Sequence, residues 1–346
     1  MGCKVCIGAN DTEQLNFEKN NEFFKRFLKF LEDSGSNQIK EEEFDSNIQK
    51  NYLDYSNEHK LQYPEEFIEK ENMYVMTPIK FKNENVFKGK WNEENKMEGP
   101  GKYYIKNDNI FIEGWWENGE LKFGRIFMPD GNIYEGYVKD SKYNGKGKLK
   151  LEKAEYEGLF ENGVFKNGKM KWNNGYEYEG DFNGYILHGK GKLTGPEGDI
   201  YEGDFDNNKM HGEGKYLYQN GNSYEGDFEY GIKKGKGKYI KNNEYIYDGN
   251  WDNDVPFGYG KLSNWDNSCI FKCTFRSGKI AEEPIFENGS KDNFNLDDFE
   301  IKPEEKKLNI KELEYLDLTL MESEATHFKL GSVPSFLADD NNEIDI

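Results

Sequence analysis

The sequence has few of the residues that build a disulfide-bonded domain, a membrane span or a large aliphatic core. Its 346 residues include 4 cysteines and 9 prolines, and 35% are hydrophobic, with a mean hydropathy of −1.00. The cysteines lie as two pairs near opposite ends, unlike the spaced set of a small secreted domain. No stretch approaches the roughly 20 apolar residues of a membrane span, and no apolar core of a cleaved signal is found. We therefore expect a cytosolic, reducing location.

A basic region is also missing. The formal net charge is −20, and the acidic excess lies in the two ends, residues 1–85 and 281–346, whereas the middle of the chain is nearly neutral. Binding to nucleic acid depends largely on neutralising phosphates with Lys and Arg. We therefore expect no nucleic-acid partner.

Catalytic and ligand-binding motifs are lacking as well. The Gly-x-Gly pairs never extend to a dinucleotide fingerprint or to a phosphate loop that ends in Lys-Ser/Thr. Cys269 and Cys273 have no His or third Cys near them in the sequence, so they are predicted to be small buried thiols and not zinc ligands. No nucleophile is accompanied by a base. We expect a protein that is not an enzyme and holds no cofactor or metal.

A repeat fills the middle of the chain. The stretch "YEGDFDNNKMHGEGKYLYQNGNS", residues 201–223, is followed at once by "YEGDFEYGIKKGKGKYIKNNEYI", residues 224–246. Successive copies begin 22 to 25 residues apart, at Phe87, Ile112, Tyr134, Tyr156, Tyr178, Tyr201, Tyr224 and Tyr247, with a degraded ninth copy at Phe271. A fixed period of this length is typical of one small unit stacked on its neighbours.

Each copy has the alternation of a β-hairpin. Tyr201, Gly203 and Phe205 occupy alternate positions, so in a strand they share one face, which we expect to be buried. A second alternating stretch with Gly212 and Gly214 follows after a polar turn. Because glycine is a poor strand former, we expect the glycines to leave a slot for the ring of the next hairpin. The predicted core positions are Tyr134, Gly136, Tyr156, Gly158, Tyr178, Gly180, Phe182, Tyr201, Gly203, Phe205, Tyr224, Gly226, Phe228, Tyr247, Gly249 and Trp251.

The motifs "YEGDF…HGEGKY", "YEGDF…KGKGKY", "YEGYV…NGKGKL" and "YDGNW…FGYGKL" resemble the MORN repeat family, named for membrane occupation and recognition nexus. Phe often stands where that family prefers Trp. Gly124 and Gly168 each lack the second glycine of the pair, so we expect their copies to pack more loosely. The resemblance implies curved, elongated antiparallel sheets, frequent homodimers, and scaffolding at junctions of membrane and cytoskeleton.

The predicted fold is mainly β, an elongated antiparallel sheet of about eight to nine hairpins. Residues 1–35 are expected to hold an acylation motif and an amphipathic helix with Phe17, Phe24, Phe27, Leu28 and Leu31 on one face, which lies on a lipid surface or packs on the array as a cap. Residues 36–75 are predicted to be an acidic linker, and 76–280 the array with a capping strand. Residues 281–346 are predicted to be an acidic, helical and disordered tail, with a helical face at Ile310, Leu313, Leu320 and Met321.

The start "MGCKVC" predicts a lipid anchor. Gly2 is placed for myristoylation, and Cys3 and Cys6 are candidates for palmitoylation, although the usual pattern has Ser or Thr at position 6. One myristoyl chain binds membranes marginally, and a second chain makes attachment stable. Chance occurrence of these residues is the alternative interpretation.

The sequence therefore predicts a scaffold anchored to the cytoplasmic face of a plasma, ciliary or cortical membrane. Proteins are expected to bind the array and the acidic tail, and a homodimer is a further hypothesis. The first alternative is a soluble structural component of a ciliary or cytoskeletal assembly. The second is a module that binds anionic phospholipids through lysines near the turns, which are Lys146, Lys148, Lys233, Lys234, Lys236 and Lys238.

Overall fold

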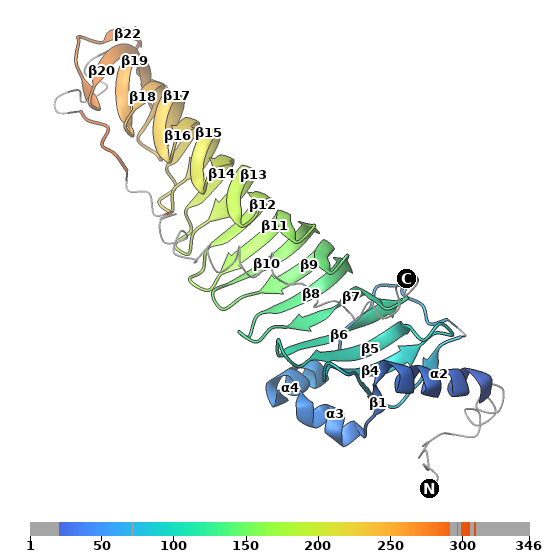
Figure 1. The fold of residues 1–346 in the computed structure, drawn as a ribbon. Helices are drawn as coiled ribbons and strands as arrows, with labels where there is room; N and C mark the ends of the chain where they lie inside the picture. The colour runs from blue at the N-terminus through green and yellow to red at the C-terminus, as the bar shows by residue number, and fades with distance from the viewer. Residues whose placement is uncertain (1–20, 71, 291–295, 297–298, 305–307, 309–346) are drawn as a thin grey trace, which may run out of the picture. The chain divides into compact units, whose positions relative to one another are not determined.

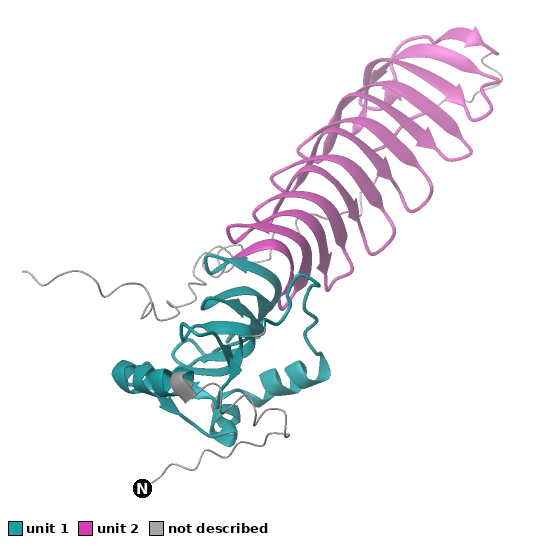
Figure 2. Cartoon of the chain, turned by 90° about the vertical axis from the view of Figure 1, so that its right-hand side faces the viewer, with its two compact units in different colours: residues 1–142, 328–346 teal, residues 143–327 magenta. Residues whose placement is uncertain are grey.

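The computed structural model describes residues 21–70, 72–290, 296, 299–304 and 308 (Figure 1). It divides into two compact units, coloured separately in Figure 2. The described part of unit 1 ends at Lys142, and unit 2 begins at Tyr143. Within each unit, consecutive long strands pair as antiparallel hairpins, so the predicted mainly β fold is confirmed.

Unit 1 combines three helices with the first hairpins. Its helices are α2 (Asn21–Ser34), α3 (Glu41–Asn47) and α4 (Lys50–Glu58). Its strands are β1 (Asn37–Gln38), β2 (Tyr74–Val75), β3 (Ile79–Lys80), β4 (Val86–Trp91), β5 (Met97–Ile105), β6 (Ile110–Glu117), β7 (Glu120–Phe127) and β8 (Ile133–Lys139).

Unit 2 consists of strands, and all but the first residue of β9 belongs to it. The strands are β9 (Lys142–Lys150), β10 (Ala154–Glu161), β11 (Val164–Trp172), β12 (Glu177–Asn183), β13 (Ile186–Thr194), β14 (Ile200–Asp206), β15 (Lys209–Leu217), β16 (Ser223–Glu229), β17 (Ile232–Lys241), β18 (Tyr245–Asp252), β19 (Val255–Asn264), β20 (Ile270–Arg276), β21 (Lys279–Ile280) and β22 (Ile285–Asn288).

The rings of four repeat tyrosines in unit 2 lie over glycines of their own hairpins, and these are Tyr178, Tyr201, Tyr224 and Tyr247. Gly203 and Gly214 face each other across the β14–β15 pair. A Cβ on Gly214 would lie 2.3 Å from the hydroxyl oxygen of Tyr201 and 2.5 Å from a ring carbon. The expectation that the slot holds a ring of the next hairpin is therefore wrong. The tyrosine side chain leans along its own strand and reaches the glycine two positions on.

The next hairpin supplies an edge contact to that ring. Tyr201 is fully buried between Phe205 of its own hairpin and Phe228 of the next, with ring centroids 5.1 Å away in both cases and interplanar angles of 89° and 85°. The same arrangement recurs around Tyr178 and Tyr224. Edge-to-face pairs stabilise by about 0.5–1.5 kcal/mol beyond the burial of their area. Ring contacts therefore join neighbouring hairpins in addition to the backbone ladder.

The two glycines of a Gly-x-Gly pair have different tasks. Gly212 lies in a β-bulge with φ +56°, in the left-handed region that glycine tolerates best. Gly214 instead leaves room for the ring of Tyr201. Only the second glycine is therefore part of the aromatic packing.

The separate roles of the two glycines explain why some copies can lack the first one. In β10–β11 the bulge skips one residue, Lys166, where β14–β15 skips two, so no glycine is needed before Gly168. Phe160 and Phe165 of that hairpin are fully buried. The expected looser packing is therefore not seen there, because the bulge is shorter and the core is complete.

The N-terminal helix packs on the first hairpin of unit 1. Phe23 stacks on Tyr74 with centroids 4.1 Å apart, and Phe27 is fully buried with its centroid 5.1 Å from Trp91. Leu28, predicted on the buried face, is 40% exposed because the buried stripe includes Phe23 instead. This helix was predicted either to lie on a lipid surface or to pack on the array as a cap. Its described residues pack on the array.

Two segments predicted as linker and tail are partly folded. Residues 36–75 contain α3 and α4, which bury Phe44 and Tyr52 against the strands of unit 1, so the segment is not a free linker. In the predicted tail, the described residues 299–304 and 308 pack on unit 2, where Ile301 donates its backbone N–H to the Gly278 carbonyl at 2.9 Å. The helix predicted around Leu313 lies outside the described residues.

Candidate functional site

A groove runs along one face of unit 2, between strands β12 and β18. Its volume is about 1100 Å³, and its floor is the backbone of paired glycines. These are Gly191, Gly203, Gly214, Gly226 and Gly237. Because the tyrosine rings fill the opposite side of the same glycines, this face has no side chain on its floor. We call it the trench face.

Charged residues of alternating sign line one wall of the trench. Each is the cross-strand neighbour of the next: Lys192, Glu202, Lys215, Glu225, Lys238 and Asp248. The Lys215–Glu225 pair has an N–O distance of 4.0 Å. Opposite charges at cross-strand positions are mutually favourable, so the row is close to neutral as a whole. The row therefore presents charges of alternating sign in a fixed order along the groove.

An apolar strip lies two residues from the charged row along the same strands. It contains Ile200, Leu217, Ile240 and Ile246, which share the parity of the charged row and therefore its face. Leu217 is 40% exposed and the isoleucines are half-buried. The trench face of unit 2 thus offers apolar contact beside ordered charge.

Unit 1 has the same face, but its own chain covers it. The positions equivalent to the apolar strip are Val86, Tyr104, Phe111 and Phe127. They form a buried cluster with Phe44 of α3, Tyr52 of α4 and Ile48 between the two helices. The Tyr52 hydroxyl donates to the carbonyl of Met128 at 2.7 Å. Burying one such aromatic side chain stabilises by about 1.5–3 kcal/mol.

The charged row of unit 1 is contacted by α4. Arg125, whose side chain is 5% exposed, pairs with Glu135 at 2.6 Å, and its guanidinium lies 5.4 Å from the ring centroid of Tyr55. Ser56 donates to a carboxylate oxygen of Glu113 at 2.8 Å. A buried guanidinium needs such partners, because an unpaired charge is costly to desolvate. The helix therefore binds the row through both rings and hydrogen bonds.

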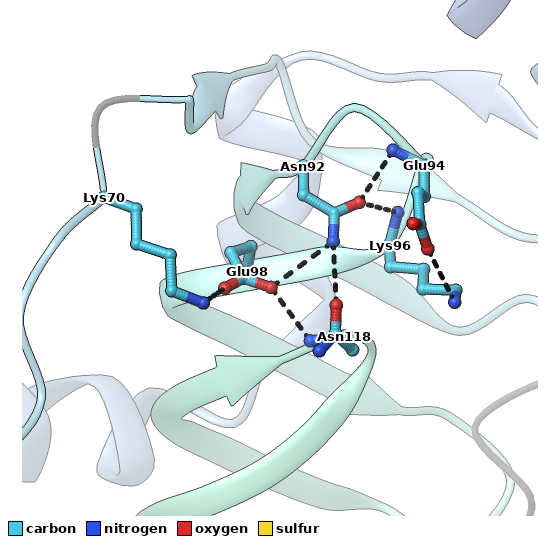
Figure 3. Close-up of polar contacts among 6 residues, drawn as sticks. All are labelled: Lys70, Asn92, Glu94, Lys96, Glu98 and Asn118. Carbon is cyan, nitrogen blue, oxygen red and sulfur yellow. Dashed lines mark hydrogen bonds and ion pairs between the residues drawn. The ribbon is translucent and has the colours of Figure 1, made fainter.

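The stretch after α4 covers the other wall. Tyr63 and Phe67 meet Trp115 with ring centroids 5.5 and 5.6 Å away. Burial raises the pKa of Tyr63 well above its ordinary value. Figure 3 shows the polar contacts that follow, in which the buried Glu98 carboxylate accepts hydrogen bonds from the amine of Lys70 at 2.5 Å and the backbone N–H of Asn118 at 2.9 Å. Residues 41–70 thus lie along the whole trench face of unit 1.

The lysines predicted to face lipid are not a uniform cationic patch. Lys148 pairs with Glu155 at 3.1 Å, Lys234 pairs with Glu229, and Lys146, Lys236 and Lys238 are exposed.

Lys233 contradicts that prediction, because it is 1% exposed. Its amine lies 5.1–5.2 Å from the ring centroids of Tyr218, Tyr224, Tyr239 and Trp251. It occupies the register position of Met210 in the preceding hairpin, which is a core position. An alignment of the copies could have indicated that position 233 is a core position, because the other copies have an apolar residue at the equivalent place before the glycine pair.

The other predicted sites are placed as follows. The ten aromatic residues predicted for the repeat core have exposed fractions between 0 and 5%. Cys269 and Cys273 are buried free thiols, and burial raises the pKa of Cys273 to about 12. Gly2, Cys3 and Cys6 lie outside the described residues. Among the residues that are described, no cluster of three metal-ligating side chains occurs, and no helix has the length and apolar character to cross a membrane.

Comparison with known families identifies the repeat. The family described as "MORN repeat" matches residues 87–110, 134–152, 178–200, 201–223, 224–244 and 247–266. The chain belongs to the MORN-repeat family. The matches leave out the copies that begin at Ile112 and Tyr156, which are the ones with the shortened bulge. The structure shows that these copies are MORN-like hairpins too.

Other comparisons add little to this assignment. No curated protein matches the sequence. Among solved structures, the chain is similar to the TCP domain of SAS-4 (dCPAP) of Drosophila melanogaster in complex with a proline-rich motif of Ana2 (dSTIL), at 10% identity, 51% of this chain, 84% of that chain and a TM-score of 0.24. The G-box domain of the microcephaly protein CPAP matches at 9% identity, 59% of this chain, 98% of that chain and a TM-score of 0.19. Scores this low do not indicate a shared fold. MORN repeats indicate a protein-binding or structural scaffold.

Proposed function

We propose that this MORN protein is a non-catalytic scaffold that docks a partner polypeptide on the trench face of unit 2 and is held by N-terminal acyl groups at a junction of membrane and cytoskeleton. One observation carries the docking proposal. The same face is covered by residues 41–70 in unit 1, whereas the groove of unit 2 is lined by side chains with exposed or half-buried positions. The covering of this face in unit 1 supports the docking of a similar segment on unit 2.

The chemistry of the face defines the partner. The strip with Leu217 favours an apolar stripe, as α3 and α4 supply in unit 1. The wall of alternating Lys and Glu favours polar or charged side chains beside that stripe, spaced to meet opposite charges. We expect an amphipathic helix or helix–strand segment of another protein, with electrostatics setting the register more than the affinity.

Crosslinking in cells tests the docking proposal. A photoreactive residue at position 217 is expected to capture one discrete partner, and Lys215→Glu is expected to lower the yield severalfold because it reverses one charge of the row. Lys209→Glu is the matched control, since it makes the same charge change at an exposed position beside the hairpin turn. Equal losses in both variants, or no capture at position 217, would refute docking on this face.

Membrane flotation tests the anchor. The full-length protein, expressed in a eukaryotic cell, is compared with Gly2→Ala and with the double variant Cys3→Ala/Cys6→Ala. We expect both variants to leave the membrane fraction at physiological salt, because one acyl chain alone binds marginally. If none of the three proteins floats, a soluble ciliary or cytoskeletal component is favoured. If all three float alike, attachment through the repeat surface is favoured, and salt would release it.

A further inference from the structure

The described residues of the C-terminal segment, 299–304 and 308, contact a surface of unit 2 that is distinct from the trench face. We define this surface, the loop edge, as the connections between hairpins at residues 195–199, 218–222 and 241–245. Phe299 meets the ring of Tyr245 with centroids 5.2 Å apart, and Leu308 is buried beside Gly195. The described part of the segment thus runs back across three successive connections.

Glu304 is the polar centre of this contact. Its carboxylate accepts hydrogen bonds from the side-chain amides of Asn220 at 2.6 Å and Asn222 at 2.8 Å, and from the Tyr239 hydroxyl at 2.8 Å. Three neutral donors that converge on one carboxylate select for an anionic acceptor. A lysine or an apolar side chain at this point would leave them without an acceptor.

Two exchanges between repeats create this site, Asn220 in place of Glu197 and Asn222 in place of Asp199. In the preceding repeat, Asp199 holds the equivalent place and accepts both the Tyr216 hydroxyl and the Gln219 backbone N–H. Asn222 keeps the backbone bond, to Asn242 at 2.9 Å, but its amide donates to the Tyr239 oxygen at 3.2 Å. The O–H of that tyrosine is therefore directed to another acceptor, which is Glu304. Two asparagines in place of two carboxylates therefore turn this connection into a site that accepts a carboxylate.

Bonds that do not involve the segment also hold the receptor. The 218–222 turn is closed by the Gly221 N–H to the Tyr218 carbonyl at 2.9 Å, and Asn222 is fixed by its bond to the next connection. The segment itself adds one isolated β-bridge, Lys279–Glu300. A preformed receptor and a short ligand are the conditions under which a ligand can be exchanged.

We propose that the loop edge is a docking site for an extended peptide, which the chain's own residues 299–304 and 308 occupy in cis. The peptide carries a glutamate three residues after a buried aliphatic residue and four residues before a second one, as Ile301, Glu304 and Leu308 do. A partner segment with this spacing displaces the chain's own segment. The site goes beyond the scaffold role of the trench face, because it gives unit 2 a second binding surface whose access depends on the C-terminal segment.

Peptide binding to the full-length chain tests the proposal. The probe is a fluorescent peptide of residues 299–308, FEIKPEEKKL, followed by anisotropy. A segment tethered in cis competes at an effective concentration on the order of millimolar, so wild type is expected to bind the probe weakly. Glu304→Ala weakens the cis segment and is expected to bind the probe about tenfold more tightly. Lys302→Ala is the matched control, since the Lys302 side chain is 77% exposed, and it is expected to behave as wild type.

One further protein variant and one altered probe test whether the effect arises at the receptor. Asn222→Asp, combined with Glu304→Ala, imports the residue of the preceding repeat and is expected to abolish probe binding, with the thermal transition retained. A probe with Gln at position 304 is expected to bind at least several-fold more weakly. If Glu304→Ala does not fold, Glu304→Gln, which preserves shape, replaces it with a smaller gain expected. Equal probe binding by wild type and the Glu304 variant, or binding that survives Asn222→Asp, would overturn the proposal.

Discussion

The packing of Tyr201 on Gly214 predicts a specific and large effect of one methyl group. Gly214 has a backbone conformation open to alanine, since it is not among the positive-φ glycines. Its Cβ, however, would lie 2.3–2.6 Å from three atoms of the tyrosine. Favourable carbon contacts lie near 3.5–4.0 Å, so the ring must move by about 1 Å.

The ring of Tyr201 cannot move away from Gly214 without losing contacts. Tyr201 is fully buried, lies against Phe205 and Phe228, and donates its hydroxyl proton to the Asp204 carbonyl at 2.9 Å. Overpacking of a core costs about 1–3 kcal/mol. Loss of the buried hydroxyl bond costs about 1–3 kcal/mol more. We expect Gly214→Ala to lower the free energy of unfolding by about 3 kcal/mol, measured by denaturant unfolding of the full chain.

Controls separate the steric cause from a backbone cause. Gly231→Ala has open space around the new Cβ but φ +89°, so it should cost only about 1–2 kcal/mol of backbone strain. In a Tyr201→Leu background the cost of Gly214→Ala should fall by about 2 kcal/mol, within the range seen for contacting residues. Gly203→Ala should not be rescued, because its Cβ meets backbone atoms at 2.5 and 2.6 Å. A Gly214→Ala variant no worse than Gly231→Ala, or an absent coupling, would refute the reasoning.

Three other predictions concern the two units. Phe27→Ala should destabilise unit 1 by about 3–5 kcal/mol in urea unfolding, whereas Leu28→Ala, at 40% exposure, should stay within about 0.5 kcal/mol. Hydrogen bonds from two lysines lower the pKa of Glu287 to about 2. The contribution of Glu287 to stability is therefore present above its unfolded pKa near 4.5 and is lost as the pH falls toward 2. The Tm difference between wild type and Glu287→Gln should shrink over that pH range. Burial raises the pKa of Tyr103 to about 12, so absorbance titration should show it ionising well above pH 10, and its contribution to stability should fall as the pH rises from 10 to 12.

The sequence-based predictions succeeded for features that recur at the same position in every repeat. Alternation and period identified hairpins, because a strand places every second residue on one face and a repeat multiplies that signal. The same alignment was not applied to Lys233, which was predicted to face lipid because lysines are rarely buried, and which the structure places at a core position. Composition likewise suggested a linker at residues 36–75, since the few apolar residues of α3 and α4 are scattered among many acidic ones.

The sequence by itself determined the unit of construction: a hairpin of about 23 residues with an aromatic face and paired glycines, repeated in order. Local spacing was sufficient for this, because each strand pairs with its neighbour in the chain. Only the tertiary structure decided which ring fills which slot, that residues 41–70 cover the trench face of unit 1, and that Glu304 reaches Asn222 from 82 residues away. These contacts join distant parts of the chain through shape and donor geometry, which no periodic pattern encodes.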